Sequence, residues 1–144
     1  WSSDVCSSDL GLAGNAGLFS TARDVARVYQ MLLNGGEIDG QRYLSKETCQ
    51  LFTTETSKIS RRGLGFDKPD ADDPKKGNCA PAAPAEVYGH TGFTGTCAWV
   101  DPVNELVYVF LSNRIYPDVT NRKLNQLHIR ERIQGAIYDA MKKK

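Results

Sequence analysis

The apolar run at residues 106–111 constrains the fold of this chain more than any other segment. Its six residues, Leu-Val-Tyr-Val-Phe-Leu, are all leucine, β-branched or aromatic, and none is charged. Such a run is typical of a strand that is covered on both faces, so we expect a central strand over residues 106–112. The turn-forming sequence Asp-Pro-Val-Asn-Glu at 101–105 separates it from a second strand, predicted over 94–100. The sequence therefore predicts an antiparallel pair of strands inside the core.

Helical patterns before and after this strand pair predict an α+β fold. Thr21 begins a capping box for a helix over residues 22–33, which the sequence Asn-Gly-Gly ends. Ser45 fits the N-cap of a short helix that runs to residue 52. Residues 124–141 predict a long amphipathic helix that packs on the sheet. Its expected apolar face comprises Ile129, Ile133, Ala136, Ile137, Ala140 and Met141.

The remaining segments predict turns, one short strand and one long loop. Residues 38–44 are typical of a small turn or hairpin, and residues 63–66 predict a short strand. The segment 67–86 contains four of the six prolines and has no periodicity, so we expect a loop. A loop of this length either shapes the rim of a cleft or is an exposed insertion, and the sequence leaves both open.

Charge and cysteine content exclude several classes of function. The chain of 144 residues carries 18 Lys and Arg against 17 Asp and Glu, and the basic residues are dispersed, so we expect no nucleic-acid partner. No run of apolar residues is long enough to predict a membrane span. Three widely spaced cysteines, Cys49, Cys79 and Cys97, form no C-x-x-C pattern, and at most one pair of them could form a disulfide. We therefore expect no metal site and no cofactor.

Residues 1–10 form a segment that we set aside. The sequence Trp-Ser-Ser-Asp-Val-Cys-Ser-Ser-Asp-Leu resembles the translation of a common short-read sequencing adapter in one frame. We expect a non-native tail over 1–10 and natural sequence from about Gly11, truncated at its N-terminus. Removing Asp4 and Asp9 leaves 15 acidic residues against 18 basic ones, so the natural part carries a net charge of +3 instead of +1.

A glycine-rich segment at residues 88–96 carries the strongest indication of chemistry. It places a histidine, hydroxyl groups and three glycines at the predicted strand over 94–100. Glycines let the backbone approach a ligand closely, and a strand edge that carries them can offer free N–H groups to a developing oxyanion. The triplet His90-Thr91-Gly92, which we expect to open that strand, resembles the third active-site motif of the serine β-lactamase, DD-peptidase and esterase superfamily.

Two further segments strengthen this resemblance. Residues 14–21, Gly-Asn-Ala-Gly-Leu-Phe-Ser-Thr, are similar to a helix start found in β-lactamase-related esterases. Residues 111–117, Leu-Ser-Asn-Arg-Ile-Tyr-Pro, are similar to a segment of class C β-lactamases and their relatives. The three motifs follow one another in the family's order, and residues 11–144 are identified as the C-terminal portion of a β-lactamase-related domain. The resemblance implies an antiparallel sheet packed against a long C-terminal helix.

The resemblance implies acyl transfer through a serine in a Ser-x-x-Lys motif, with help from a Tyr-x-Asn motif. This sequence contains neither motif, and in the family both lie upstream of the segments that match here. We therefore expect a fragment that is inactive alone and lacks the N-terminal part of its own domain. The expected substrate of the intact parent is a small-molecule or peptide acyl compound, and the family suggests an exported parent in the periplasm or cell envelope.

The resemblance also implies roles for the residues of the third motif. The backbone N–H of Phe93, directly after Gly92, would be one of two oxyanion donors. His90 would lie beside the proton relay, and Thr91 would turn its hydroxyl toward the substrate. Both also have structural interpretations, His90 as a satisfied residue at a strand end and Thr91 as a plain strand former.

Arg114 and Asp118 would lie on the wall of the cleft that faces a substrate carboxylate. An acid at Asp118, together with His90 where β-lactamases carry lysine, disfavours β-lactamase activity and favours a peptidase- or esterase-like parent. For Arg114 a structural role is an equal alternative.

Two alternatives to this interpretation stay open. The parent could be a non-catalytic module that binds cell-wall peptides or glycans, and residues 62–67 and 113–117 resemble domains fused behind family 3 glycoside hydrolases. The chain could also be an unrelated α+β domain, without an open cleft beside His90. If the upstream strands are missing, an exposed sheet edge should make the chain poorly soluble or self-associating.

Overall fold

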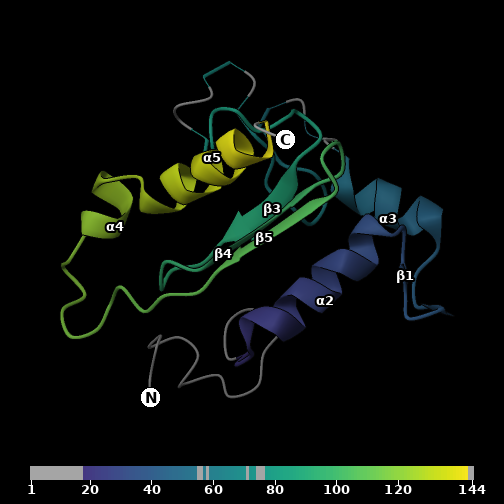
Figure 1. Ribbon diagram of the computed structural model, residues 1–144, viewed down its shortest axis with the longest axis horizontal. Coiled ribbons are helices and arrows are strands. Elements are labelled where there is room, and N and C mark those ends of the chain that lie inside the picture. Colours follow the sequence, from purple (N-terminus) through teal and green to yellow (C-terminus); the bar gives the residue numbers. More distant parts are fainter. Residues whose placement is uncertain (1–17, 55–56, 58, 71, 74–76, 143–144) are drawn as a thin grey trace.

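The computed structural model shows three layers, in which an antiparallel sheet lies between two helices (Figure 1). It describes residues 18–54, 57, 59–70, 72–73 and 77–142. Helix α2 (Ala22–Leu33) covers one face of the sheet, and helix α5 (Ile129–Met141) covers the other. This arrangement confirms the α+β class. The tail predicted over 1–10 lies outside the described residues.

Side-chain caps begin the two helices of the N-terminal half where the sequence predicted them. The hydroxyl of Thr21 accepts a hydrogen bond of 3.2 Å from the backbone N–H of Asp24 at the start of α2. The hydroxyl of Ser45 accepts one of 3.1 Å from the N–H of Thr48 at the start of α3 (Lys46–Thr53). Each bond satisfies a backbone donor that has no partner inside the helix. Both predicted helices are confirmed.

A small hairpin connects these helices, as predicted for residues 38–44. Strand β1 (Glu37–Ile38) pairs with β2 (Gln41–Arg42) in antiparallel register. Asp39 and Gly40 between them have φ values of 52° and 77°. Two successive residues with positive φ are typical of the tight hairpin turn that matches the twist of its strands.

The sheet places strand β4 (Cys97–Asp101) between β3 (Tyr88–Thr91) and β5 (Leu106–Phe110). The prediction of residues 106–112 as a central strand is therefore wrong, because β5 has a strand partner on one side only within the described part of the chain. Its apolar sequence has another cause, since α2 packs on one of its faces and Tyr108 reaches α5 from the other. Cover on both faces therefore does not require a central position. The expectation that the chain associates with itself through an exposed sheet edge stays a prediction.

The glycine-rich segment turns the chain from β3 into β4. The N–H of Gly92 donates to the carbonyl of Thr96 at 2.8 Å, and the N–H of Gly95 donates to the carbonyl of Gly92 at 3.0 Å. Gly95 has a φ of 92°, which other residues rarely adopt. His90 and Thr91 therefore end strand β3, and β4 begins three residues after the predicted start of that strand, so the expectation that the triplet opens a strand is wrong.

The strand predicted over 63–66 is also wrong, because this segment makes a turn. The N–H of Gly63 donates to the carbonyl of Phe66 at 3.0 Å. Asp67 makes isolated bridges to Arg62 and to Gly89, and neither bridge extends into a strand. The described residues of 67–86 contain no helix or named strand, as expected for a loop.

The long C-terminal helix predicted over 124–141 is divided in two. A short helix α4 (Lys123–Gln126) ends before His128, whose φ of 49° and ψ of 44° are left-handed, and α5 follows. The buried side chains of α5 are Arg130, Gln134 and Tyr138, so most of the predicted apolar face is wrong, although Ile137 is partly buried and packs against the core. Ile133 is 39% exposed, and the face toward the sheet is displaced by one residue along the helix.

Polar partners explain why α5 buries these side chains. The side-chain oxygen of Gln134 accepts a hydrogen bond of 2.8 Å from the N–H of Ala80. The hydroxyl of Tyr138 donates to the carboxylate of Asp101 at 2.8 Å. A buried polar group is stable where it has a partner, and these partners come from distant parts of the chain. Apolar periodicity alone therefore does not identify this face.

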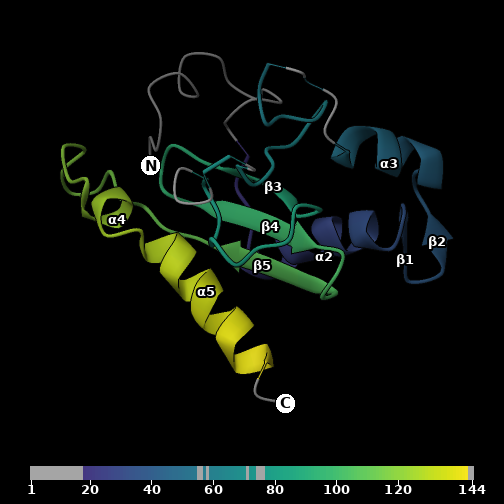
Figure 2. The same ribbon diagram turned by 90° about the horizontal axis from the view of Figure 1, so that it is seen from above.

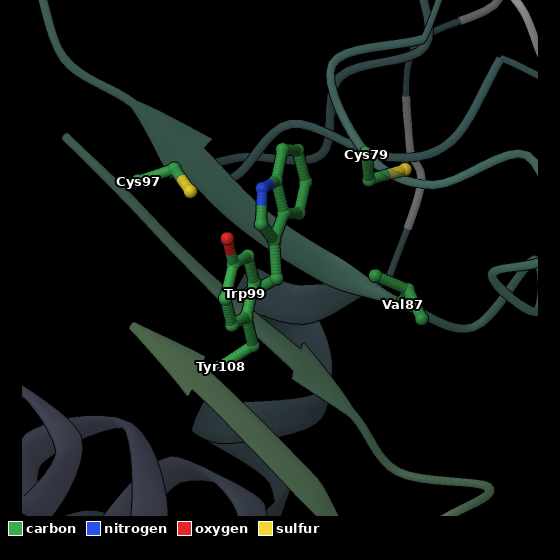
Figure 3. Packing of buried hydrophobic residues seen from close by; sticks show 5 residues of the cluster. All are labelled: Cys79, Val87, Cys97, Trp99 and Tyr108. Atoms are coloured by element: carbon green, nitrogen blue, oxygen red, sulfur yellow. The ribbon is translucent and has the colours of Figure 1, made fainter. Parts of the chain in front are cut away.

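The core beneath α5 is a cluster of five buried residues (Figure 3). They are Cys79, Val87, Cys97, Trp99 and Tyr108. The Trp99 indole is 1% exposed and lies in the middle of the cluster (Figure 3). Burial raises the pKa of the Cys79 thiol to about 12 and that of the Cys97 thiol to about 11. Both thiols are free, as is the buried Cys49, so no disulfide joins the three.

Helices α3 and α4 lie at opposite ends of the molecule (Figures 1 and 2). In the view from above, helix α5 runs at an angle to the strands on the side of β5, and its C-terminal end extends beyond the sheet (Figure 2). Within the described ranges, no helix is both long enough and apolar enough to cross a membrane.

Candidate functional site

The C-terminal end of β3 opens into a pocket of about 480 Å³. Three segments that are far apart in the sequence line it together: residues 18–20, 90–92 and 111–113. Each belongs to one of the three motifs that carry the family resemblance. The fold therefore brings the three motifs to one site, with His90, Thr91 and Gly92 in its wall.

Asp67 fixes the strand that carries His90. Its N–H donates to the carbonyl of Gly89 at 2.8 Å, and the N–H of Gly89 donates back at 3.1 Å. The Asp67 side chain is 1% exposed and accepts hydrogen bonds from Arg61 at 3.1 Å and from Asn78 at 3.0 Å. A Cβ on Gly89 would lie 2.1 Å from the carbonyl oxygen of Ala98, so this position requires glycine. Asp67 was not predicted as a site residue, because its partners are distant in the chain.

The hydrogen bond of His90 determines which ring nitrogen carries the proton. Its Nδ1 lies 2.6 Å from the carbonyl oxygen of Thr91. A carbonyl oxygen can only accept, so Nδ1 donates. In the neutral ring, Nε2 is then a hydrogen-bond acceptor. The exposed imidazole at the pocket can therefore accept a proton or a hydrogen bond through Nε2.

The turn after His90 presents a free backbone donor. Among the described residues, none accepts a hydrogen bond from the N–H of Phe93. A Cβ on Gly92 would lie 2.4 Å from the Thr96 hydroxyl, so the tight turn requires glycine there. The Arg114 guanidinium lies 4.7 Å from the centre of the Phe93 ring, and the Arg114 N–H donates to Thr94 at 2.9 Å. These contacts hold the turn from the segment that follows β5.

The structure does not bring Arg114 and Asp118 into the pocket with His90. The guanidinium of Arg114 contacts the Phe93 ring and the carbonyl of Val119 at 3.5 Å, and neither Arg114 nor Asp118 lines the pocket. The carboxylate of Asp118 accepts hydrogen bonds from the Thr120 hydroxyl and N–H at 2.7 and 2.8 Å. These bonds lower the pKa of Asp118 below its usual value.

An apolar wall completes the pocket, and its residues were not predicted to belong to a site. Tyr29 on α2 and Leu111 after β5 both line the pocket. Burial raises the pKa of the Tyr29 hydroxyl. Tyr29 follows Val25 by one helical turn, and that spacing was a signal for a shared face toward the sheet. In the described part of the chain, no group of three or more His, Cys, Asp or Glu residues could hold a metal ion.

Comparison with known proteins identifies the family. The family model described as Beta-lactamase matches residues 2–131. Proteins from Escherichia coli O157:H7, Escherichia coli K12 and Salmonella agona SL483 are each 36% identical to this chain over 115 residues. Each carries the name "Putative D-alanyl-D-alanine carboxypeptidase". The match covers 80% of this chain and 26% of each relative, so the chain spans about a quarter of their length.

The residues that the family model matches include those that line the pocket. The family model covers most of the chain, and all three motifs that line the pocket fall within the matched residues. The chain therefore belongs to the beta-lactamase family, within the serine β-lactamase and DD-peptidase superfamily.

Proposed function

We propose that this chain is the C-terminal part of a peptidase- or esterase-like serine hydrolase that acts by acyl transfer. The observation that carries the proposal is the convergence of three family motifs on one pocket, next to the N–H of Phe93, which has no acceptor in the described part of the chain. The nucleophilic serine and its lysine belong to the upstream part of the domain, as does the Tyr-x-Asn motif. The 144-residue chain alone is then inactive.

The proposed role of the turn is to stabilise charge. When the upstream serine attacks the acyl carbonyl carbon, its proton passes to the general base and the carbonyl oxygen becomes negative. The Phe93 N–H donates to that oxygen, and one such donor typically contributes about 10²–10³-fold in rate. The oxyanion then collapses and expels the leaving amine or alcohol, which takes up the proton. Water releases the acyl group from the serine in a second, equivalent step.

The other motif residues support the same site in this proposal. Nε2 of His90 accepts a hydrogen bond from the upstream tyrosine, because Nδ1 is held by Thr91. The Thr91 hydroxyl contacts the substrate. Asp67 positions both residues through its backbone bonds to Gly89.

The test begins with the source DNA upstream of the Gly11 codon. We expect the reading frame to continue without the adapter-like codons into Tyr-x-Asn and, further upstream, Ser-x-x-Lys. The intact product should hydrolyse acyl substrates and form a covalent serine adduct with a fluorophosphonate probe. Replacing the serine of Ser-x-x-Lys by alanine should remove both activities, and the 144-residue chain should show neither.

Two results would contradict the proposal. Serine-dependent hydrolysis by the 144-residue chain alone would show that the nucleophile is not missing. An intact parent without Ser-x-x-Lys would favour the non-catalytic module that binds cell-wall peptides or glycans. The same upstream sequence tests the proposal that the parent is exported, because a secretory signal peptide should precede the domain.

A further inference from the structure

We infer that a second pocket, between α5 and residues 77–81, is a binding site for a primary ammonium group on a short alkyl chain. This pocket has a volume of about 490 Å³ and shares no lining residue with the pocket beside His90. The inference goes beyond the proposed function and does not depend on it. The upstream serine, lysine and tyrosine of that function belong to the other pocket, which α2 lines.

A carboxylate that is nine-tenths buried lines the second pocket, and one of its oxygens has no hydrogen-bond partner. The Glu131 side chain is 10% exposed, and no atom of the described residues donates to its Oε2. Its Oε1 lies 3.9 Å from Nη2 of Arg130, which is longer than a hydrogen bond, and the same Nη2 donates to Asn125 at 3.1 Å. Buried polar atoms normally have a partner, and an ionised carboxylate oxygen only accepts. Oε2 of Glu131 therefore favours a ligand that donates a hydrogen bond.

The charges of the lining favour a donor that is positively charged. Glu131 lies in the first turn of α5, where the helix dipole stabilises a negative charge. Apart from one histidine, the charged lining residues are Glu131, Asp139 and Arg132, and the last two are exposed. The charge inside the pocket is thus negative. A hydrogen bond between an ammonium group and a carboxylate is about twice as strong as one between neutral groups.

A glycine inside α5 leaves room for an alkyl chain. Gly135 follows Glu131 by one helical turn and lines the same pocket. A Cβ built on Gly135 would meet no described atom within 4 Å, so close packing does not require glycine there. Glycine in the middle of a helix is less stable than alanine. It leaves a space beside the carboxylate, and Pro81 and Ala136 add apolar walls to that space.

Hydrogen bonds fix both walls of the second pocket. The side chain of Gln134 on α5 holds the N–H of Ala80 at 2.8 Å. On the other wall, the side chain of Asn78 donates to the buried carboxylate of Asp67 at 3.0 Å. Residues 77–81 are therefore tied both to α5 and to the segment that holds β3. Binding a ligand between fixed walls costs little ordering of the protein.

Two sources could supply the ammonium group, a separate alkylamine and a lysine of the same chain. Lys75 and Lys76 directly precede Gly77 in the sequence, and both lie outside the described residues. The double variant Lys75→Gln/Lys76→Gln distinguishes the two sources. Equal amine affinity in the native chain and the variant assigns the site to a separate amine. An affinity that is at least about tenfold higher in the variant assigns it to one of these lysines.

The first experiment compares n-butylammonium with n-butanol, which have nearly the same shape and differ in charge. Each is titrated at pH 7.5 into the full 144-residue chain and into the double lysine variant. Binding is followed by NMR through the amides of Gly77 and Gly135 and the methyl group of Ala136. We expect n-butylammonium to bind at least about tenfold more tightly, with shifts at these residues. Equal or tighter binding of n-butanol in both proteins would overturn the inference, as would shifts confined to other parts of the chain.

The charge of Glu131 is tested by Glu131→Gln, which keeps the shape of the side chain. In the protein that binds n-butylammonium, this variant should lower its affinity at least about tenfold and leave that of n-butanol unchanged. The control is Glu47→Gln, since Glu47 lies in the first turn of α3 and does not line the second pocket. The same affinities in the two variants would overturn the inference.

The space beside Gly135 is tested by filling it. Gly135→Leu should weaken the binding of both probes, because its side chain would occupy the pocket. The helix should be retained, since leucine is a better helix former than glycine. Ala140→Leu is the control at an exposed position of α5 that does not line the pocket, and it should bind as the native chain does. Unchanged binding by Gly135→Leu would overturn the inference.

The intact parent tests whether the upstream part of the domain leaves the second pocket accessible. We expect the same preference for n-butylammonium there as in the 144-residue chain. Loss of the preference in the parent would overturn the inference for the whole protein. Serine-dependent hydrolysis by the same sample tests the proposed function separately, because neither probe is an acyl compound.

Discussion

The two faces of the sheet differ in how completely they are covered. Under α5, Gln134 and Tyr138 are buried and hydrogen-bonded, and the cluster around Trp99 is closed. Under α2, no helical side chain is fully buried, and the wall opens into the pocket beside His90. We therefore expect the residues under α5 to contribute most of the stability of the fold, and the residues under α2 to leave the pocket open to a ligand. Substitutions on the two faces should therefore separate stability from binding.

The largest expected effect comes from the centre of the closed face. Trp99→Ala should lower the free energy of unfolding by about 3–5 kcal/mol, because it removes a fully buried aromatic side chain and leaves a cavity. Urea denaturation followed by circular dichroism measures the change. Val103→Ala is the control, since Val103 is 58% exposed and should change the value by less than about 0.5 kcal/mol. If Trp99→Ala lowers the free energy of unfolding by less than about 1 kcal/mol, the α5 face does not contribute most of the stability.

The polar contact between α5 and the loop before β3 should come next. Gln134→Ala leaves the buried N–H of Ala80 without an acceptor and should cost about 1–3 kcal/mol. Gln126→Ala, at an exposed position on α4, serves as the matched control. If both variants are equally stable, the hydrogen bond from Ala80 to Gln134 does not stabilise the packing of the loop 67–86 against α5.

Alkaline pH should destabilise the closed face through Cys97. Burial raises the pKa of its thiol from the ordinary value of 9.0 to about 11 in the folded chain. Above pH 9 the unfolded thiol loses its proton while the folded one keeps it, so stability falls with rising pH until about pH 11. One such group contributes at most about 1.4 kcal/mol per pH unit.

The measurement is the urea midpoint of unfolding at pH 8, 9 and 10, for the native chain and for Cys97→Ala. The variant should show a shallower decline between the last two values, whatever its stability at pH 8. An unchanged steepness would mean that the Cys97 thiol is not protected by the fold.

The smallest effect is expected at the N-cap of α3, outside both faces of the sheet. Ser45→Ala should cost about 1 kcal/mol, because the N–H of Thr48 loses its acceptor. Ser45→Gly should cost only a few tenths of a kcal/mol, since glycine lets water reach the same donor. Thermal unfolding measures both variants. Equal losses of stability in Ser45→Ala and Ser45→Gly would mean that the Thr48 N–H does not depend on the Ser45 hydroxyl as its cap.

Sequence alone predicted the elements that depend on local signals. Thr21 and Ser45 cap their helices as expected, and Asp39-Gly40 makes the expected turn, because each interaction joins residues a few positions apart. The break in the C-terminal helix at His128 was not predicted. The predicted face of α5 was wrong for most of its residues, since Gln134 and Tyr138 are buried by partners at Ala80 and Asp101. Hydrophobic periodicity contains no information about such partners.

The site was also predicted only in part, because its motifs were found and its long-range contacts were not. The motifs at residues 18–20, 90–92 and 111–113 were found by resemblance, and they lie together in the structure. Asp67 was missed, and Arg114 lies outside the pocket, because the bridge to Gly89 and the stacking on Phe93 depend on the tertiary fold. The catalytic roles of His90 to Phe93 stay predictions until the intact parent is tested.

The bridge between Asp67 and Gly89 has a consequence for how such a domain can change. The loop 67–86 is tied down at both of its ends, by this bridge and by the ammonium group of Lys68, which donates to the carbonyl of Glu86 at 2.9 Å. Lengthening a loop whose ends are already fixed costs little free energy, because closure entropy grows only slowly with length. Insertions or deletions between the two anchors can therefore alter what surrounds the pocket while the strand carrying His90 keeps its place.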